Sequence, residues 1–131
     1  MPSQSKKKKS LNFILPLVIY PFDVMFSFGE TDEQVVAHLK NYNIDTTDNK
    51  GWVFEETTVG RCIIFPGNQT LIRLLDFPST PKEYGHLQHE IFHAVHFILK
   101  KMGFKLKMSS GEAYAYLTQY LTEQVYNIIN K

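Results

Sequence analysis

The sequence predicts a single α+β domain, in which a small antiparallel or mixed sheet with one short helix precedes a hairpin of two longer helices. The length of 131 residues suits one domain. β-Branched and aromatic residues separated by turn signals dominate residues 11–78, whereas helical periodicity dominates the rest. Hydrophobic residues are 44% and charged residues 21% of the chain, which is typical of a packed globular protein rather than a disordered one.

The first ten residues, MPSQSKKKKS, are polar and lysine-rich, so we expect a flexible basic tail at 1–10 and a single domain over 11–131. The lysines precede an apolar run, Leu11 to Tyr20, in an order that imitates a signal peptide. Pro16 interrupts this run, no small-residue cleavage site follows it, and it is shorter than the ~20 residues that cross a bilayer. We therefore expect no secretion and no membrane partner.

The net charge and the cysteine count restrict the binding partners and the cellular compartment that we expect. The formal net charge is +1, so no global field attracts nucleic acid, and a local contact through Lys6, Lys7, Lys8 and Lys9 is the alternative left open. Cys62 is the only cysteine, which excludes an intramolecular disulfide and favours a reducing compartment. A cytoplasmic location follows as the expectation.

Strand patterning begins the domain. Residues between Leu11 and Phe28 alternate in the manner of a strand, and Pro16 and Pro21 are confined to strand ends, bulges or an edge because proline cannot donate to a ladder. Thr31 and Gln34 then form a capping box, which predicts a short amphipathic helix through about Tyr42.

A turn-rich segment, Asn43 to Gly51, predicts a surface loop, after which the sheet resumes. We expect an extended stretch from Trp52 to Phe54, then a hairpin in which Val59–Phe65 and Thr70–Phe77 flank the turn Pro66–Asn68.

Two helices are predicted next. Ser79 or Thr80 is suited to cap a helix whose first residue is Pro81 and which ends at about Met102, before Gly103. A second helix, with Ser110 as its cap, is expected from Gly111 to near Asn130.

The first of these helices carries His89-Glu90-Ile91-Phe92-His93, an H-E-x-x-H motif. Histidines four residues apart lie on one helical face, so both imidazoles can reach one tetrahedral Zn²⁺. Glu90 stands beside that face, where its carboxylate can take the proton of a metal-bound water. The motif therefore predicts a hydrolytic zinc site.

A catalytic zinc needs a third protein ligand, and His₂Glu is an established set. Glu112 is the candidate, because it begins the second helix, 19 residues after His93, where a helix hairpin could return it to the metal. Tyr116 lies one turn further on the same face, and its phenol could hydrogen-bond an oxyanion.

These residues carry a resemblance to a family. HEIFHAV followed by EAYAYL, within residues 86–121, resembles small gluzincin-type zinc metallopeptidase domains, similar to ImmA/IrrE-like proteins and to compact zincins of phages and prophages. The resemblance implies that His89, His93 and Glu112 bind zinc, that Glu90 is general base and acid, and that an edge strand holds an extended peptide or protein substrate. A regulatory protein partner and a host-cell cytoplasm are implied in the same way.

Other interpretations stay open. The alternative function is a catalytically inactive interaction protein of the same fold, a phage or mobile-element accessory factor in which the zinc is structural. His86 and His96 are spaced three residues from the motif histidines, so either is a candidate for contact with metal or substrate, or for a surface or supporting role. Cys62, within an apolar strand pattern, is expected to be an inert strand residue.

Overall fold

The computed structural model describes residues 9–45, 53–54 and 57–131. This part of the chain forms four strands, three α-helices and a 3₁₀ turn at Met108–Ser110. In chain order the main elements are β1 (Leu11–Pro16), β2 (Asp23–Phe28), α1 (Asp32–Asn41), β3 (Gly60–Phe65), β4 (Gln69–Leu74), α2 (Pro81–Lys101) and α3 (Gly111–Ile129). The α+β class and the mixed sheet agree with the sequence-based prediction.

The sheet has the strand order β1-β2-β4-β3, so β1 and β3 are its edges. β1 pairs antiparallel with β2, and β3 pairs antiparallel with β4 through the predicted turn. The two hairpins join through β2 and β4, which run parallel. That parallel pair requires a crossover, which the segment containing α1 supplies.

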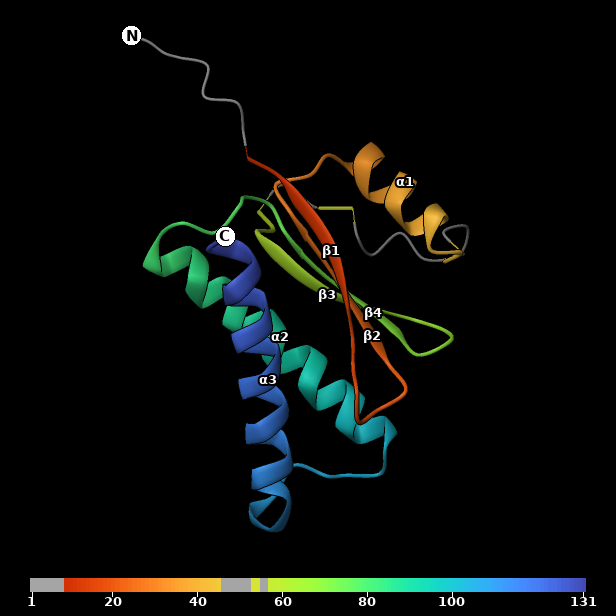
Figure 1. The fold of residues 1–131 in the computed structure, drawn as a ribbon, viewed down its shortest axis with the longest axis vertical. Helices are drawn as coiled ribbons and strands as arrows, with labels where there is room; N and C mark the ends of the chain where they lie inside the picture. Colours follow the sequence, from red (N-terminus) through yellow and green to blue (C-terminus); the bar gives the residue numbers. More distant parts are fainter. Residues whose placement is uncertain (1–8, 46–52, 55–56) are drawn as a thin grey trace, which may run out of the picture.

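The helices lie on both faces of the sheet, with α1 on one side and α2 and α3 on the other (Figure 1). Alternate side chains along each strand point to opposite faces of the sheet and form two hydrophobic cores. Val24, Phe26 and Phe28 of β2 face the α2–α3 layer, where the fully buried Leu87, Ile91 and Leu121 belong to the same cluster. The opposite face contributes a smaller core under α1, made of Met25, Val35, Leu39, Ile44, Ile63, Phe65 and Leu71.

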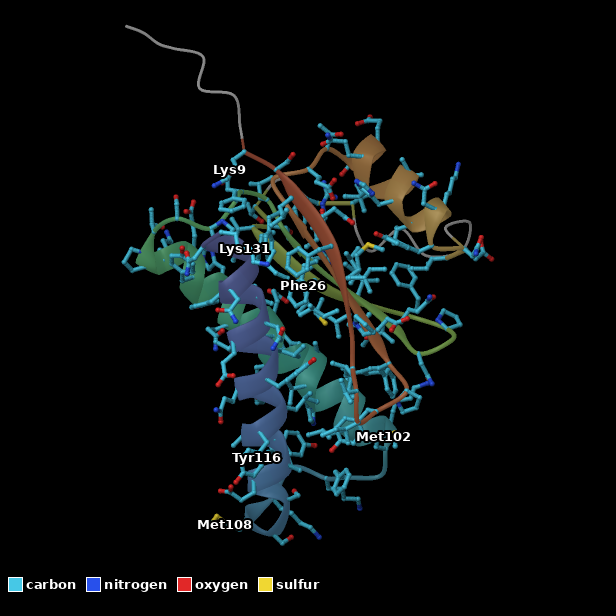
Figure 2. The ribbon with its side chains drawn as sticks, viewed as in Figure 1. Lys9, Phe26, Met102, Met108, Tyr116 and Lys131 are labelled. Carbon is cyan, nitrogen blue, oxygen red and sulfur yellow. The ribbon has the colours of Figure 1, made fainter. Side chains whose placement is uncertain are left out.

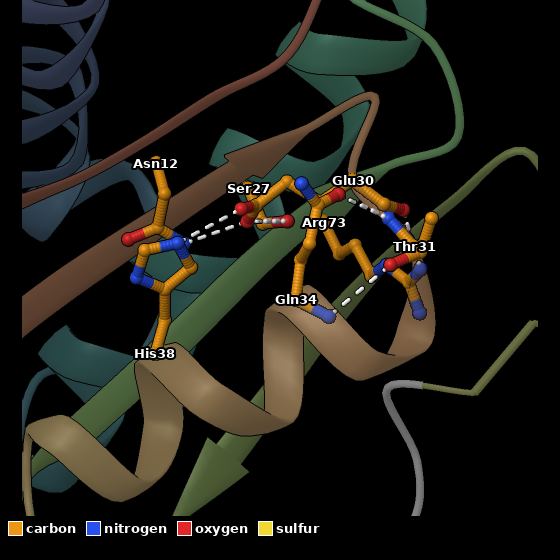
Figure 3. A network of polar contacts seen from close by, with 7 residues as sticks. All are labelled: Asn12, Ser27, Glu30, Thr31, Gln34, His38 and Arg73. Carbon is orange, nitrogen blue, oxygen red and sulfur yellow. Dashed lines mark hydrogen bonds and ion pairs between the residues drawn. The ribbon is translucent and has the colours of Figure 1, made fainter.

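A buried carboxylate, Glu30, ties α1 to the sheet (Figure 3). Its Oε1 accepts hydrogen bonds from Asn12 Nδ2 at 2.8 Å and Ser27 Oγ at 2.7 Å, and its Oε2 lies 3.0 Å from His38 Nε2. Arg73 donates to the Glu30 carbonyl and, at 2.7 Å, to Asp32 Oδ1 in the first turn of α1. Residues of β1, β2, β4 and α1 therefore share one polar network inside the fold.

The ends of α1 and α2 follow the local signals of the sequence. Thr31 and Gln34 form the predicted capping box. Of the two candidates at the start of α2, Thr80 is the cap and pairs reciprocally with Glu83, while Pro81 is the first helical residue. α2 ends before Gly103, whose φ of +93° suits glycine.

α3 runs back along α2 as an antiparallel hairpin, so the chain ends near the start of α2 (Figure 1). Three cross-helix pairs define the register: Tyr84 with Tyr126, Gln88 with Thr122, and His96 with Tyr114. A residue one position later on α2 therefore lies opposite a residue one position earlier on α3.

Some predicted boundaries were wrong. β4 ends at Leu74 rather than Phe77, because the chain turns away toward the cap of α2. Val53 and Phe54 belong to no strand, and Trp52 lies outside the described residues. Ser110 occupies the cap position of α3, but its hydroxyl bonds to the carbonyls of Lys105 and Lys107 instead of capping the helix. Residues 1–8 of the predicted tail also lie outside the description.

Within the described residues, no helix combines the length and the apolar character that crossing a membrane requires.

Candidate functional site

The two motif histidines lie together on the exposed face of α2. His89 Nε2 and His93 Nε2 are 3.1 Å apart, and their ring centroids are 4.7 Å apart in an edge-to-face arrangement. The α-helical turn causes this proximity, because residues i and i+4 stack one above the other. One imidazole can donate a hydrogen bond to the other, and two ring nitrogens this close together can also bind one metal ion.

Glu90, between the two histidines in sequence, is buried at the inner edge of the same face. Burial raises the pKa of the Glu90 carboxyl above its ordinary range, and the positive charges of the neighbouring histidines and Arg61 offset part of this rise. A carboxylate in this environment holds a proton more strongly than one at the surface. It is therefore better suited to accept and return a proton than an ordinary surface carboxylate is.

A groove separates α2 from the edge strand β3 and contains all three motif side chains. Its volume is about 590 Å³. The strand side consists of Thr58, Gly60, Arg61, Cys62 and Ile64, and the helix side of His89, Glu90, His93, His96, Phe97 and Lys100. The three motif side chains therefore line a groove along the edge strand β3.

Gly60, the first residue of β3, makes room for the Glu90 carboxylate. A Cβ atom added at Gly60 would lie 3.2 Å from Glu90 Oε2, 3.4 Å from Glu90 Cγ and 3.0 Å from Leu74 Cδ2. A side chain at this position would displace one of these groups. Gly60 is a site residue that the sequence reasoning missed, although a glycine at a strand end is a recognised signal of close approach.

Cys62 lines the groove two residues further along β3. Burial, with a smaller contribution from the Glu90 charge, raises the pKa of its thiol from an ordinary 9.0 to about 12. The thiol therefore stays protonated near neutral pH, as the expectation of an inert strand residue requires.

The structure does not bring Glu112 to the histidine pair. The register of the α2–α3 hairpin places Glu112 opposite Ile98. At the helical rise per residue, Ile98 lies about 7 Å along the axis from His93 and about 14 Å from His89. Its side chain is exposed. Tyr116 is 66% exposed and lines a different pocket, between α3 and the β1–β2 connection. The roles proposed for both residues stay predictions.

The two remaining histidines of α2 differ in position. His96 lines the groove, where its ring stacks on Phe92 at 6.0 Å and tilts toward Tyr114 at 6.1 Å. His86 lies in a separate pocket at the start of α2, with Val59 and Glu83. His96 therefore belongs to the candidate site, and His86 contributes to it only through its charge on Glu90.

The histidine pair fits part of a zinc site. Two nitrogens bound at 2.0 to 2.1 Å to a tetrahedral Zn²⁺ lie about 3.3 Å apart, close to the 3.1 Å between His89 Nε2 and His93 Nε2. Among the described residues, no group of three or more His, Cys, Asp or Glu side chains is placed to hold a metal ion together. The distance between the two histidine nitrogens is therefore compatible with one zinc ion, whereas Glu112 does not lie beside them.

Comparison with protein-family models finds no match to this chain, and comparisons with curated proteins and with solved structures find none either. The resemblance to gluzincin-type domains therefore rests on the motif residues alone.

Proposed function

We propose that this protein is a zinc-dependent peptide hydrolase in which His89 and His93 bind the metal and Glu90 is the general base. One observation carries the proposal: two imidazole nitrogens 3.1 Å apart stand beside a buried carboxylate of raised pKa, and all three line one groove. A pair of surface histidines without function has no need of such a carboxylate, because burying it costs free energy.

The edge strand supports a peptide as the substrate class. β3 pairs with β4 on one side and is an edge of the sheet that the described residues form. An extended peptide in the groove can pair with its backbone, while alternate side chains of the peptide point toward α2 or away from it. This arrangement would carry a scissile carbonyl past the histidine pair.

His89 and His93 would hold the zinc, which would lower the pKa of a bound water to ~7 and polarise the substrate carbonyl. Glu90 accepts the proton of the attacking water and returns it to the leaving amine. The groove wall formed by β3 holds the peptide in line and excludes bulk water from its inner side. For the developing oxyanion, His96 and Arg61 are donors on the groove itself, whereas Tyr116 would have to approach from outside it.

The first experiment is metal analysis of the purified full-length chain, wild type beside His93→Ala. We expect one zinc per chain in the wild type and loss of zinc in His93→Ala. His96→Ala is the matched control, because His96 lines the same groove outside the pair, and it should retain the metal. A wild type that takes up no zinc when zinc is offered would contradict the proposal.

Turnover is tested separately with Glu90→Gln, an isosteric change that removes the base. Hydrolysis of a peptide library should fall by about 10²- to 10⁴-fold while zinc content is unchanged. Equal hydrolysis by wild type and Glu90→Gln would remove Glu90 from the mechanism.

A non-catalytic interaction protein with structural zinc is the second candidate. The exposure of Glu112, away from the histidine pair, favours it, because a partner protein could then complete the metal coordination. Zinc that binds the wild type but supports no hydrolysis of any peptide would select this candidate.

A further inference from the structure

One end of the molecule combines exposed apolar side chains with lysines. We name it the basic–apolar end and define it as Leu17–Tyr20, which connects β1 to β2, together with Lys100–Tyr116, which holds the end of α2, the connecting segment and the start of α3. Figure 2 shows Met102, Met108 and Tyr116 at this end, and Lys9 and Lys131 toward the other.

Apolar side chains protrude from two separate turns at this end. Val18 is 87% and Ile19 83% exposed at the tip of the β1–β2 connection, and Met108 is 100% exposed on the connection between the helices. Met102, Phe104, Leu106 and Tyr116 are also exposed. Isolated exposed apolar residues are ordinary, but a group of seven at one end of a small domain marks an interaction surface.

The charges of the same end have one predominant sign. Its four lysines, Lys100, Lys101, Lys105 and Lys107, stand against one carboxylate, Glu112, which is a surplus of three positive charges on a chain whose formal net charge is +1. In the segment 104–108 lysines alternate with apolar residues, as FKLKM. Lysine stems can lie along an apolar phase while their ammonium groups remain at its charged boundary.

Two cavities meet at this end. The first, of about 420 Å³, lies between the β1–β2 connection and α3 and is lined by apolar and tyrosine side chains, among them Val18, Ile19 and Tyr116. The second, of about 510 Å³, is lined by Lys105, Lys107, two serines and their neighbours. Ala113 lines both cavities, so the apolar cavity and the lysine-lined cavity are neighbours.

We propose that the basic–apolar end docks on the surface of an anionic phospholipid bilayer. Protruding tips of Val18, Ile19 and Met108 would enter the boundary of the acyl chains, and Lys105 and Lys107 would contact the headgroup phosphates. Lysine is depleted in the cores of protein–protein interfaces, so exposed apolar side chains interleaved with lysines match an anionic lipid interface better than a protein partner. This proposal departs from the expectation of no membrane partner, which was drawn from the shortness of the apolar run Leu11 to Tyr20. It requires contact with the bilayer surface and not a helix that crosses the bilayer, and it does not require the zinc site.

The test is co-sedimentation of the full-length chain with vesicles of phosphatidylcholine, with and without phosphatidylserine. We expect binding only when phosphatidylserine is present and weaker binding at high salt. Lys105→Gln with Lys107→Gln should lower the partition coefficient roughly 25-fold, since each surface lysine contributes roughly fivefold. Val18→Ser with Ile19→Ser should lower it at least about tenfold through lost apolar burial.

Matched controls lie at the opposite end of α2. Lys82→Gln with Lys131→Gln, and Val59→Ser with Leu75→Ser, change the same kinds of exposed residue and should leave binding within about twofold. Replacing Lys6–Lys9 by glutamine separates the contribution of the basic tail. The proposal is overturned if no vesicle binds, if the tail variant alone abolishes binding, or if the Val18 and Ile19 variant binds like the wild type.

Discussion

Gly60 and the Glu90 carboxylate occupy adjoining space, so that a Cβ atom at Gly60 would stand 3.2 Å from Glu90 Oε2. The strand and the helix that form the groove are therefore fitted to each other at the residue proposed as general base. A change of side chain on β3 should act on Glu90 without altering the motif itself.

Gly60→Val should lower the free energy of unfolding by about 1 to 3 kcal/mol, because the added methyl groups meet Leu74 as well as Glu90. Peptide hydrolysis should fall further than the loss of folded protein explains, since the carboxylate is displaced. Urea denaturation and turnover at a temperature where the variant stays folded measure the two effects. Gly85→Ala is the control, because a Cβ there meets nothing within 4 Å, and it should stabilise α2 by about 0.5 to 1 kcal/mol.

Glu112→Ala tests the third ligand that the sequence predicts. As a ligand, Glu112 would have to approach the pair from its exposed position on α3, and its removal should weaken zinc binding at least about tenfold. Competition with a chromophoric chelator measures the affinity. Glu123→Ala, an exposed glutamate further along α3, is the control. If both variants bind zinc like the wild type, Glu112 is not a ligand.

The Cys62 thiol should react slowly with iodoacetamide. Its pKa of about 12, against an ordinary 9.0, leaves about a thousandfold less thiolate at pH 8 in the folded protein than in the unfolded one. Alkylation followed by mass spectrometry, with and without urea, measures this difference. Because the folded state holds the proton more strongly, this thiol should lower folding stability as pH rises from about 9 toward 12. Equal alkylation rates in both solvents would show that Cys62 is accessible.

Glu30→Ala should destabilise the fold by about 2 to 4 kcal/mol. It leaves the buried Ser27 hydroxyl and the Asn12 amide without the acceptor they share, and it removes the partner of His38. Chemical denaturation measures the loss. Glu33 is exposed in the first turn of α1, and Glu33→Ala should change the free energy of unfolding by less than about 0.5 kcal/mol. A Glu30→Ala variant as stable as Glu33→Ala would show that the network contributes little.

The sequence by itself determined the features that depend on residues close together in the chain. The capping boxes at Thr31 and Thr80 and the stop at Gly103 follow from local hydrogen bonding and from backbone conformation. The proximity of His89 to His93 belongs to the same class, because an α-helix places residues four apart on one face. The α+β class was equally readable from the change of hydrophobic period.

Only the tertiary structure decided the relationships between distant segments. Strand patterning is the same for a parallel and an antiparallel neighbour, so the joining of two hairpins through parallel β2 and β4, with β3 at the edge, was not visible in the sequence. The packing of α3 on α2 sets a register that leaves Glu112 opposite Ile98 and exposed. Burial of Glu90 against Gly60 and the gathering of lysines with apolar tips at one end likewise arise from contacts across the fold, which local propensity does not encode.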